Sequence, residues 1–167
     1  MYAWQFAKAL YTSERHSWTP FVSMQNHLNL INREEEREMI PLCRDAGIAV
    51  LPWSPLARGR LTRDWEQSSG RAQADDVGKA LYTQRTADSD RSVVEAVAAI
   101  ATERGVPQAQ VALAWVMQSA GVTAPLVGAS KPHHLTDAIA ALSLQLTHEE
   151  RLRLETPYVP HAVVGFK

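Results

Sequence analysis

The chain has 167 residues and is 46% hydrophobic, which is enough to bury the core of one ordinary domain and argues against a disordered protein. Its 17 basic and 18 acidic residues leave a formal net charge of -1, which argues against a nucleic-acid or anionic-membrane surface. We therefore expect a small-molecule partner, with no nucleic acid and no membrane.

Cysteine content and hydropathy set the expected compartment. Cys43 is the single cysteine, so an internal disulfide is excluded, and we expect a buried, unreactive thiol and no metal site. The longest apolar runs fall far short of the roughly 18 residues that a membrane span needs, and residues 1–18 lack the apolar core and cleavage site of a signal peptide. The expectation is a cytoplasmic protein.

The first part of the chain predicts a helix, a strand and a helix. Apolar positions recur at helical spacing over residues 2–13, and residues 21–26 form a short apolar strand candidate. Residues 33–47 predict the next helix, because three glutamates suit its first turn and Gly47 favours its end. Pro41 removes one backbone hydrogen bond there, so the helix either kinks or restarts, and both alternatives stay open.

The middle of the chain predicts a buried strand, a long loop and two helices. Residues 48–53 are apolar at consecutive positions, which is typical of a strand in a parallel sheet covered by helices. The polar stretch over residues 61–87 is too long for a routine connection, so we expect a lid-like loop. Helices follow over residues 91–105 and 107–121, each ending at a glycine.

The last part predicts a third strand and two more helices. Residues 123–130 form the strand candidate, which leads into a helix over residues 131–142 with proline near its start. The final helix is predicted to begin at Thr147, where Glu150 completes a capping-box pattern. Strands separated by helices favour right-handed crossovers and one parallel sheet, so the expected fold class is α/β.

The loop after residues 48–53 is the first candidate site, because ligands of α/β proteins bind at the carboxyl ends of strands. The sequence WSPLARGR offers the hydroxyl of Ser54, a glycine at Gly59 that permits close approach of a ligand, and the positive charges of Arg58 and Arg60 for a phosphate. A surface turn with solvated arginines remains an equal alternative.

The other two strand ends carry similar groups. VGASKPHH combines Lys131 with a helix N-terminus that favours an anion, although a solvated surface lysine is the alternative. His133 and His134 are adjacent, so they point in different directions and do not suit a shared metal ion. In MQNHLN, Gln25 suits either an amide-bearing ligand or loop backbone, and His27 has no recognisable partner for general-base work.

These segments resemble one known family. FVSMQNHLNLINREEEREMIPLCRDAGIAVLPWSPLARGRL, LVGASKPHHLTDAIAAL and PYVPHAVVGF together are similar to the C-terminal half of aldo-keto reductases, over nearly the whole chain. The resemblance implies a single partial domain over residues 1–167, a partial (β/α)8 TIM barrel made of roughly the last three strands with their helices. It also implies an NADP(H) cofactor and NADPH-dependent reduction of aldehydes or ketones.

The resemblance assigns cofactor roles residue by residue. Gln25 resembles the glutamine that holds the nicotinamide carboxamide, and Trp53 resembles the aromatic residue that stacks on the nicotinamide ring. Ser54, Leu56 and Gly59 resemble the loop that wraps the pyrophosphate. Arg71 resembles a basic position in the family's lid. Gly128, Ser130 and Lys131 resemble the segment that contacts the adenosine 2′-phosphate.

The adenine end departs from the family pattern. His134 stands where the family usually carries Gln or Arg, and Asp137 takes the place of an acidic residue that meets the adenine. Ala138 replaces an asparagine that binds adenine in many members, which predicts weaker adenine recognition.

No catalytic residue is expected in this chain. The resemblance begins inside the helix after the family's fifth strand, so the family's catalytic Asp, Tyr, Lys and His fall outside it. None of the four tyrosines is expected at a strand end: Tyr2, Tyr11, Tyr82 and Tyr158.

Open strand edges predict that the chain associates with itself or with a complementary half-barrel chain. Where a catalytic half is present, we expect a small carbonyl compound as the substrate. Two alternatives to an enzyme half remain open. One is a non-catalytic nucleotide-binding or interaction module, and the other is a degenerate remnant without a ligand.

Overall fold

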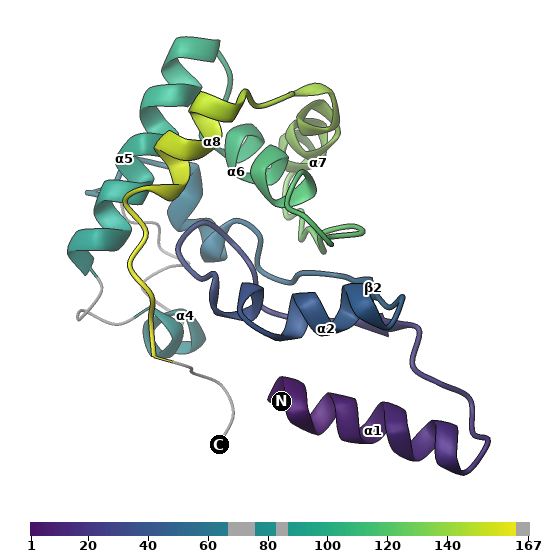
Figure 1. Ribbon diagram of the computed structural model, residues 1–167. Helices are drawn as coiled ribbons and strands as arrows, with labels where there is room; N and C mark the ends of the chain where they lie inside the picture. The colour runs from purple at the N-terminus through teal and green to yellow at the C-terminus, as the bar shows by residue number, and fades with distance from the viewer. Residues whose placement is uncertain (67–75, 83–86, 163–167) are drawn as a thin grey trace.

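The computed structural model describes residues 1–66, 76–82 and 87–162, which form an α/β structure (Figure 1). The helices are α1 (Ala3–Arg15), α2 (Met39–Asp45), α4 (Asp76–Leu81), α5 (Ala87–Arg104), α6 (Gln108–Met117), α7 (Pro132–Ala140) and α8 (His148–Glu155). The two strands are β1 (Ser23–Met24) and β2 (Ala49–Val50), and short 3-10 segments are η1 (Glu34–Glu36), η2 (Ala57–Thr62) and η4 (Ala141–Ser143). The predicted fold class is confirmed at this level.

β1 and β2 pair in parallel, with Met24 opposite Val50. The pairing continues beyond both strands, because the N–H of Trp53 donates to the carbonyl of Asn26 at 2.8 Å and His27 forms a parallel bridge with Trp53. Both strands therefore end at the same edge of the sheet.

The third strand, predicted over residues 123–130, is not formed as a strand. Its beginning still runs beside β2, because Val122 makes a parallel bridge there and the N–H of Leu126 donates to the carbonyl of Pro52 at 2.7 Å. On the β2 side, the N–H of Val50 donates to the Thr123 side chain and Pro52 has no N–H to donate, so a regular ladder does not develop. Three parallel segments nevertheless bring their carboxyl ends to one edge.

The helix predicted over residues 33–47 is in fact two elements, η1 and α2. The chain restarts at Met39, which places Pro41 in the first turn of α2, where its missing N–H costs no intrahelical hydrogen bond. Just beyond the end of α2, Gly47 has a φ of +65°, the left-handed conformation that favours glycine there. Of the two alternatives for Pro41, the structure therefore shows a helix that restarts and not one that kinks.

The lid-like segment expected over residues 61–87 is not loop throughout. Where the structure describes it, it contains the end of η2 and the helix α4, and Tyr82 closes α4 by donating its N–H to the carbonyl of Gly78 at 3.0 Å. The six residues of α4 show no strong apolar periodicity, so the sequence did not predict this helix.

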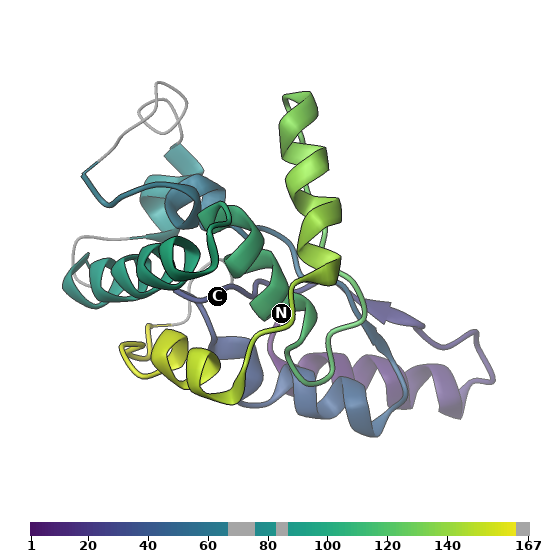
Figure 2. The ribbon, with the colours of Figure 1, turned by 90° about the horizontal axis from the view of Figure 1, so that it is seen from above.

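The helices lie in two groups. α1 lies against α2, whereas α5 packs against α6 and α8 on the other side of the strands (Figure 1). Seen from above, α7 runs at a steep angle to α5 and α6 (Figure 2). Trp115 of α6 is fully buried, and its indole N–H donates to Glu155 of α8 at 2.9 Å, so the centre of the core carries a satisfied polar group.

α8 begins as predicted. The Thr147 hydroxyl accepts from the N–H of Glu150 at 3.2 Å, and the Glu150 carboxylate accepts from the N–H of Thr147 at 2.7 Å. Arg104 of α5 also donates to both carboxylate oxygens of Glu150, at 2.5 and 2.7 Å, and this pairing lowers the pKa of Glu150 to about 2. The capping box thus fastens α8 to α5.

Thr147→Ala removes one half of this capping box, and we expect a loss of about 1 kcal/mol in the free energy of unfolding. Urea unfolding monitored by circular dichroism measures the change. Thr136→Ala, at an exposed position within α7, is the control and is expected to change stability by less than about 0.5 kcal/mol. Equal effects of the two substitutions would show that the cap contributes nothing.

Candidate functional site

Two expected cofactor residues lie at the shared edge of the parallel segments. Gln25 directly follows β1 with an exposed side chain, and Trp53 ends the paired stretch that begins with β2. The Trp53 indole is half-buried and stacks on the His27 imidazole, with ring centroids 4.1 Å apart and an interplanar angle of 9°. One face of Trp53 is therefore covered by a protein ring.

A buried polar cluster lies behind this stack. The hydroxyl of Tyr82 is 2.9 Å from Nε2 of His27, and Nδ2 of Asn29 donates to the Ser54 carbonyl at 3.0 Å and to the Tyr82 hydroxyl at 3.0 Å. We call His27, Asn29, Trp53, Ser54 and Tyr82 the strand-end cluster. The expectation that no tyrosine lies at a strand end is wrong for Tyr82, because nothing in residue spacing predicts its contact with His27, 55 residues away.

Burial sets the charge of the strand-end cluster. It lowers the pKa of His27 to about 4 and raises the pKa of Tyr82 to about 12, although a hydrogen bond from Asn29 opposes the second shift. Both rings are therefore neutral at pH 7. The Arg60 guanidinium supplies a positive charge beside them, 5.2 Å from the Tyr82 ring centroid and 5.7 Å from that of Trp65.

The loop after β2 has a strained backbone. Ser54, Ala57 and Arg58 have φ values of +55°, +47° and +56°, which side-chain-bearing residues adopt rarely, and Gly59 follows at +93°. The Thr62 hydroxyl donates to the Gly59 carbonyl at 2.8 Å and holds the turn. Such left-handed positions cost roughly 1–3 kcal/mol each and cluster at binding sites. Leu56, the remaining predicted loop residue, is half-buried against the core.

The third strand end leads into α7. Gly128 and Ser130 are exposed there, and Lys131 is the exposed N-cap residue of α7. The Ser130 N–H donates to Nδ1 of His134 at 3.3 Å, so this imidazole is engaged with its own helix N-terminus. The expected phosphate-binding residues therefore share one exposed turn.

The adenine end is less open than the family pattern implies. The Asp137 carboxylate accepts a hydrogen bond from the Gln110 side chain at 3.0 Å, which ties α7 to α6. Arg71, the expected lid residue, lies outside the described residues.

Comparison with known proteins identifies the family. Residues 1–156 match the family model described as Aldo/keto reductase family. The chain belongs to this family. Versiconal hemiacetal acetate reductase of Aspergillus parasiticus is 41% identical over 164 residues, which cover 98% of this chain and 48% of that protein. Aldo-keto reductase AMT2 of Alternaria alternata is 41% identical over 160 residues, 95% of this chain and 42% of that protein.

A third relative extends the comparison to yeast. A putative aryl-alcohol dehydrogenase of Schizosaccharomyces pombe is 40% identical over 169 residues, 99% of this chain and 46% of that protein. This aldo/keto reductase chain therefore spans about half the length of the curated relatives it matches.

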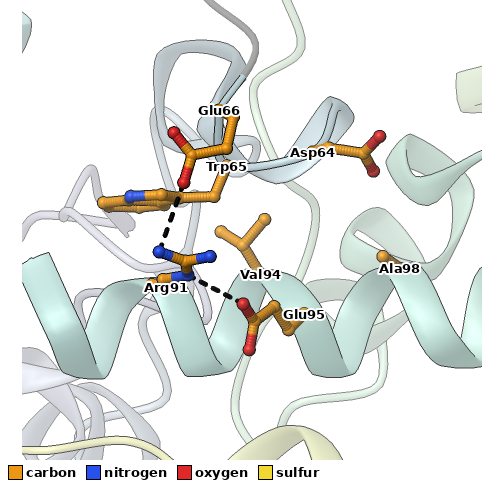
Figure 3. Close-up of a pocket in the computed structure, with 7 residues that line it drawn as sticks. All are labelled: Asp64, Trp65, Glu66, Arg91, Val94, Glu95 and Ala98. Atoms are coloured by element: carbon orange, nitrogen blue, oxygen red, sulfur yellow. Dashed lines mark hydrogen bonds and ion pairs between the residues drawn. The ribbon is translucent and has the colours of Figure 1, made fainter.

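A separate pocket lies between residues 64–66 and α5 (Figure 3). Its volume is about 200 Å³, and Arg91 spans it with ion pairs to Glu66 at 3.2 Å and Glu95 at 2.8 Å. Since none of the expected cofactor residues lines this pocket, we assign it no part in the candidate site. Among the residues that the structure describes, no group of three or more His, Cys, Asp or Glu is arranged for a metal ion, and no helix is long and apolar enough to cross a membrane.

His27 gives the stability of this chain a distinct pH dependence. Its pKa falls from 6.5 to about 4 on folding, so the unfolded chain binds more protons between those values and stability is lost as pH falls through that window. The contribution is at most roughly 3 kcal/mol. Urea unfolding at pH 7, 6 and 5 should show a shallower pH dependence for His27→Phe than for the unchanged protein.

The exposed His133 provides the control, because His133→Phe removes a histidine outside the strand-end cluster. This variant should keep the pH dependence of the unchanged protein. Identical pH profiles for His27→Phe and the unchanged protein would contradict a buried neutral His27.

Proposed function

We propose that this chain supplies the cofactor-binding part of an NADPH-dependent aldo/keto reductase that reduces aldehydes or ketones. The observation that carries the proposal is the common edge of the parallel segments. Gln25, Trp53 and the strained loop after β2 meet at this edge, and the turn before α7 lies at the neighbouring strand end. We further propose that the three parallel segments are roughly the last three strands of a (β/α)8 barrel.

The donor set at this edge suits a nicotinamide dinucleotide phosphate. The exposed amide of Gln25 matches the nicotinamide carboxamide, and Trp53 presents an aromatic surface backed by His27. The glycine-containing loop suits the pyrophosphate, and Lys131 at the start of α7 suits the 2′-phosphate. The cofactor, when bound, supplies the hydride, and these residues bind and orient it.

We propose that the acid that protonates the carbonyl oxygen is not supplied by the strand-end cluster. Tyr82 is the tyrosine that reaches this cluster, but its pKa of about 12 and its hydrogen bond to His27 make it a poor proton donor at pH 7. The described chain thus binds the cofactor, and the proton comes from a catalytic half of the kind found in the family.

NADPH binding tests this proposal. Titration of the purified chain, followed by NADPH fluorescence, should saturate, and Lys131→Ala should weaken NADPH about tenfold because a charge-assisted phosphate contact is lost. NADH, which lacks the 2′-phosphate, should be affected little by the same change. Lys8→Ala, on the exposed surface of α1, is the matched control and should leave both affinities unchanged.

Two outcomes contradict the proposal. Absence of saturable binding, together with no rise in melting temperature with any dinucleotide, would indicate a remnant without a ligand. Turnover of NADPH by the isolated chain with a panel of aldehydes would contradict its lack of a catalytic acid.

We also propose that the chain associates through its open sheet edge, either with itself or with a complementary half barrel. The segment leading into β1 carries exposed apolar side chains, with exposed fractions of 62% for Trp18, 51% for Phe21 and 74% for Val22. Unpaired edges and apolar patches of this kind favour association.

Sedimentation velocity measures the self-association. The chain should form larger species as its concentration rises, and Val22→Lys should reduce them because it places a charge at this edge. The control is Leu152→Lys, at a 51% exposed leucine of α8, which should leave the distribution unchanged. A monomer at every concentration would rule out self-association.

A further inference from the structure

The orientation of the Asn29 amide is set by the backbone. Its Oδ1 accepts the N–H of Ile31 at 3.0 Å, so its Nδ2 must face the other way, 3.1 Å from Nε2 of His27. The Nδ2 group carries two protons and no lone pair that accepts. One proton points to the Ser54 carbonyl at 3.0 Å, and the other is shared between the Tyr82 hydroxyl at 3.0 Å and Nε2 of His27. Nε2 of His27 is therefore the unprotonated ring nitrogen, and the proton of the neutral imidazole is on Nδ1.

This assignment fixes the direction of the hydrogen bond from Tyr82. Because Nε2 carries no proton, the Tyr82 hydroxyl, 2.9 Å away, donates to it and accepts from Asn29. The exposed fractions are 8% for His27, 0% for Asn29 and 5% for Tyr82, so water does not compete for these groups. Hydrogen bonds at Nε2 thus fix the orientation of the His27 imidazole, and the Trp53 indole stacks on its face.

We propose that Tyr82 is a positioning residue for Trp53, acting through His27. Tyr82 directly follows α4, so the same hydrogen bond links the segment 76–82 to His27, the ring on which Trp53 stacks. Loss of the hydroxyl leaves Nε2 with Asn29 alone and frees the imidazole to rotate, and the indole stacked on it loses its fixed plane. One part of this proposal rests on the proposed function, namely that a nicotinamide ring stacks on Trp53.

The Arg60 guanidinium also contacts Tyr82. It lies 5.2 Å from the Tyr82 ring centroid and 5.7 Å from that of Trp65, and the His27 ring meets the phenol edge to face with centroids 5.8 Å apart. Tyr82→Phe keeps this packing and removes one oxygen atom, which makes it the cleanest variant for the test.

The first experiment observes Trp53 directly. The full chain is labelled with 5-fluorotryptophan, and the Trp53 fluorine resonance is assigned with Trp53→Phe. Tyr82→Phe should shift and broaden the Trp53 resonance while the resonances of Trp115 in the core and Trp4 on α1 stay in place. Tyr11→Phe, at a 62% exposed tyrosine, is the control and should change none of them.

Two results would overturn the proposal. One is a Trp53 resonance that is identical in Tyr82→Phe and in the unchanged chain. The other is an equal change at Trp115 and Trp4, which would show general loosening of the fold in place of a positioning role.

The second experiment connects positioning to the cofactor. NADPH affinity should fall roughly threefold to tenfold in Tyr82→Phe and stay constant in Tyr11→Phe. If the unchanged chain does not bind NADPH, the proposed function fails, and the fluorine spectrum alone still decides whether Tyr82 positions Trp53. If it binds NADPH with an affinity that Tyr82→Phe leaves intact, the link to the cofactor is wrong.

A measurement on the unchanged chain remains decisive even if Tyr82→Phe does not fold. Nitrogen-15 chemical shifts of the His27 ring should show a protonated Nδ1 and an unprotonated, hydrogen-bonded Nε2. A protonated Nε2 would reverse the hydrogen bond to Tyr82 and overturn the proposed support.

Discussion

The parallel backbone ladder is the constraint on which the candidate site depends. The N–H of Trp53 donates to Asn26, and the N–H of Leu126 donates to Pro52, so three stretches of chain run in one direction and end at one edge. Each stretch has a different polar segment after it. Parallel pairing therefore converts three distant pieces of sequence into neighbours, although β1 and β2 are only two residues long each.

Burial and hydrogen bonding then determine what this edge can do. The strand-end cluster combines a neutral imidazole, a neutral phenol and an amide, and its hydrogen bonds are directed by the fixed orientation of Asn29. Both rings are uncharged at pH 7, and the imidazole lies flat against the Trp53 indole. Positive charge lies beside the Tyr82 ring at Arg60, and the exposed Lys131 at the start of α7 carries another.

Polar contacts join residues 158–161, which follow α8, to the rest of the fold. Tyr158 donates its hydroxyl proton to Glu34 at 2.5 Å, the N–H of His161 donates to the same carboxylate at 2.7 Å, and the His161 ring lies 3.0 Å from Asp90. This ring contact with Asp90 raises the pKa of His161. Residues 158–161 thus connect η1 with the start of α5.

The sequence by itself determined the α/β class, the main helices and the capping box of α8, because apolar periodicity and caps act over a few neighbouring residues. It also indicated the family and the strand ends as the place to look. Only the tertiary structure decided that α2 restarts before Pro41, that residues 123–130 pair too little to form a strand, and that Tyr82 reaches His27. These outcomes depend on contacts between segments far apart in the chain, which no local pattern of residues encodes.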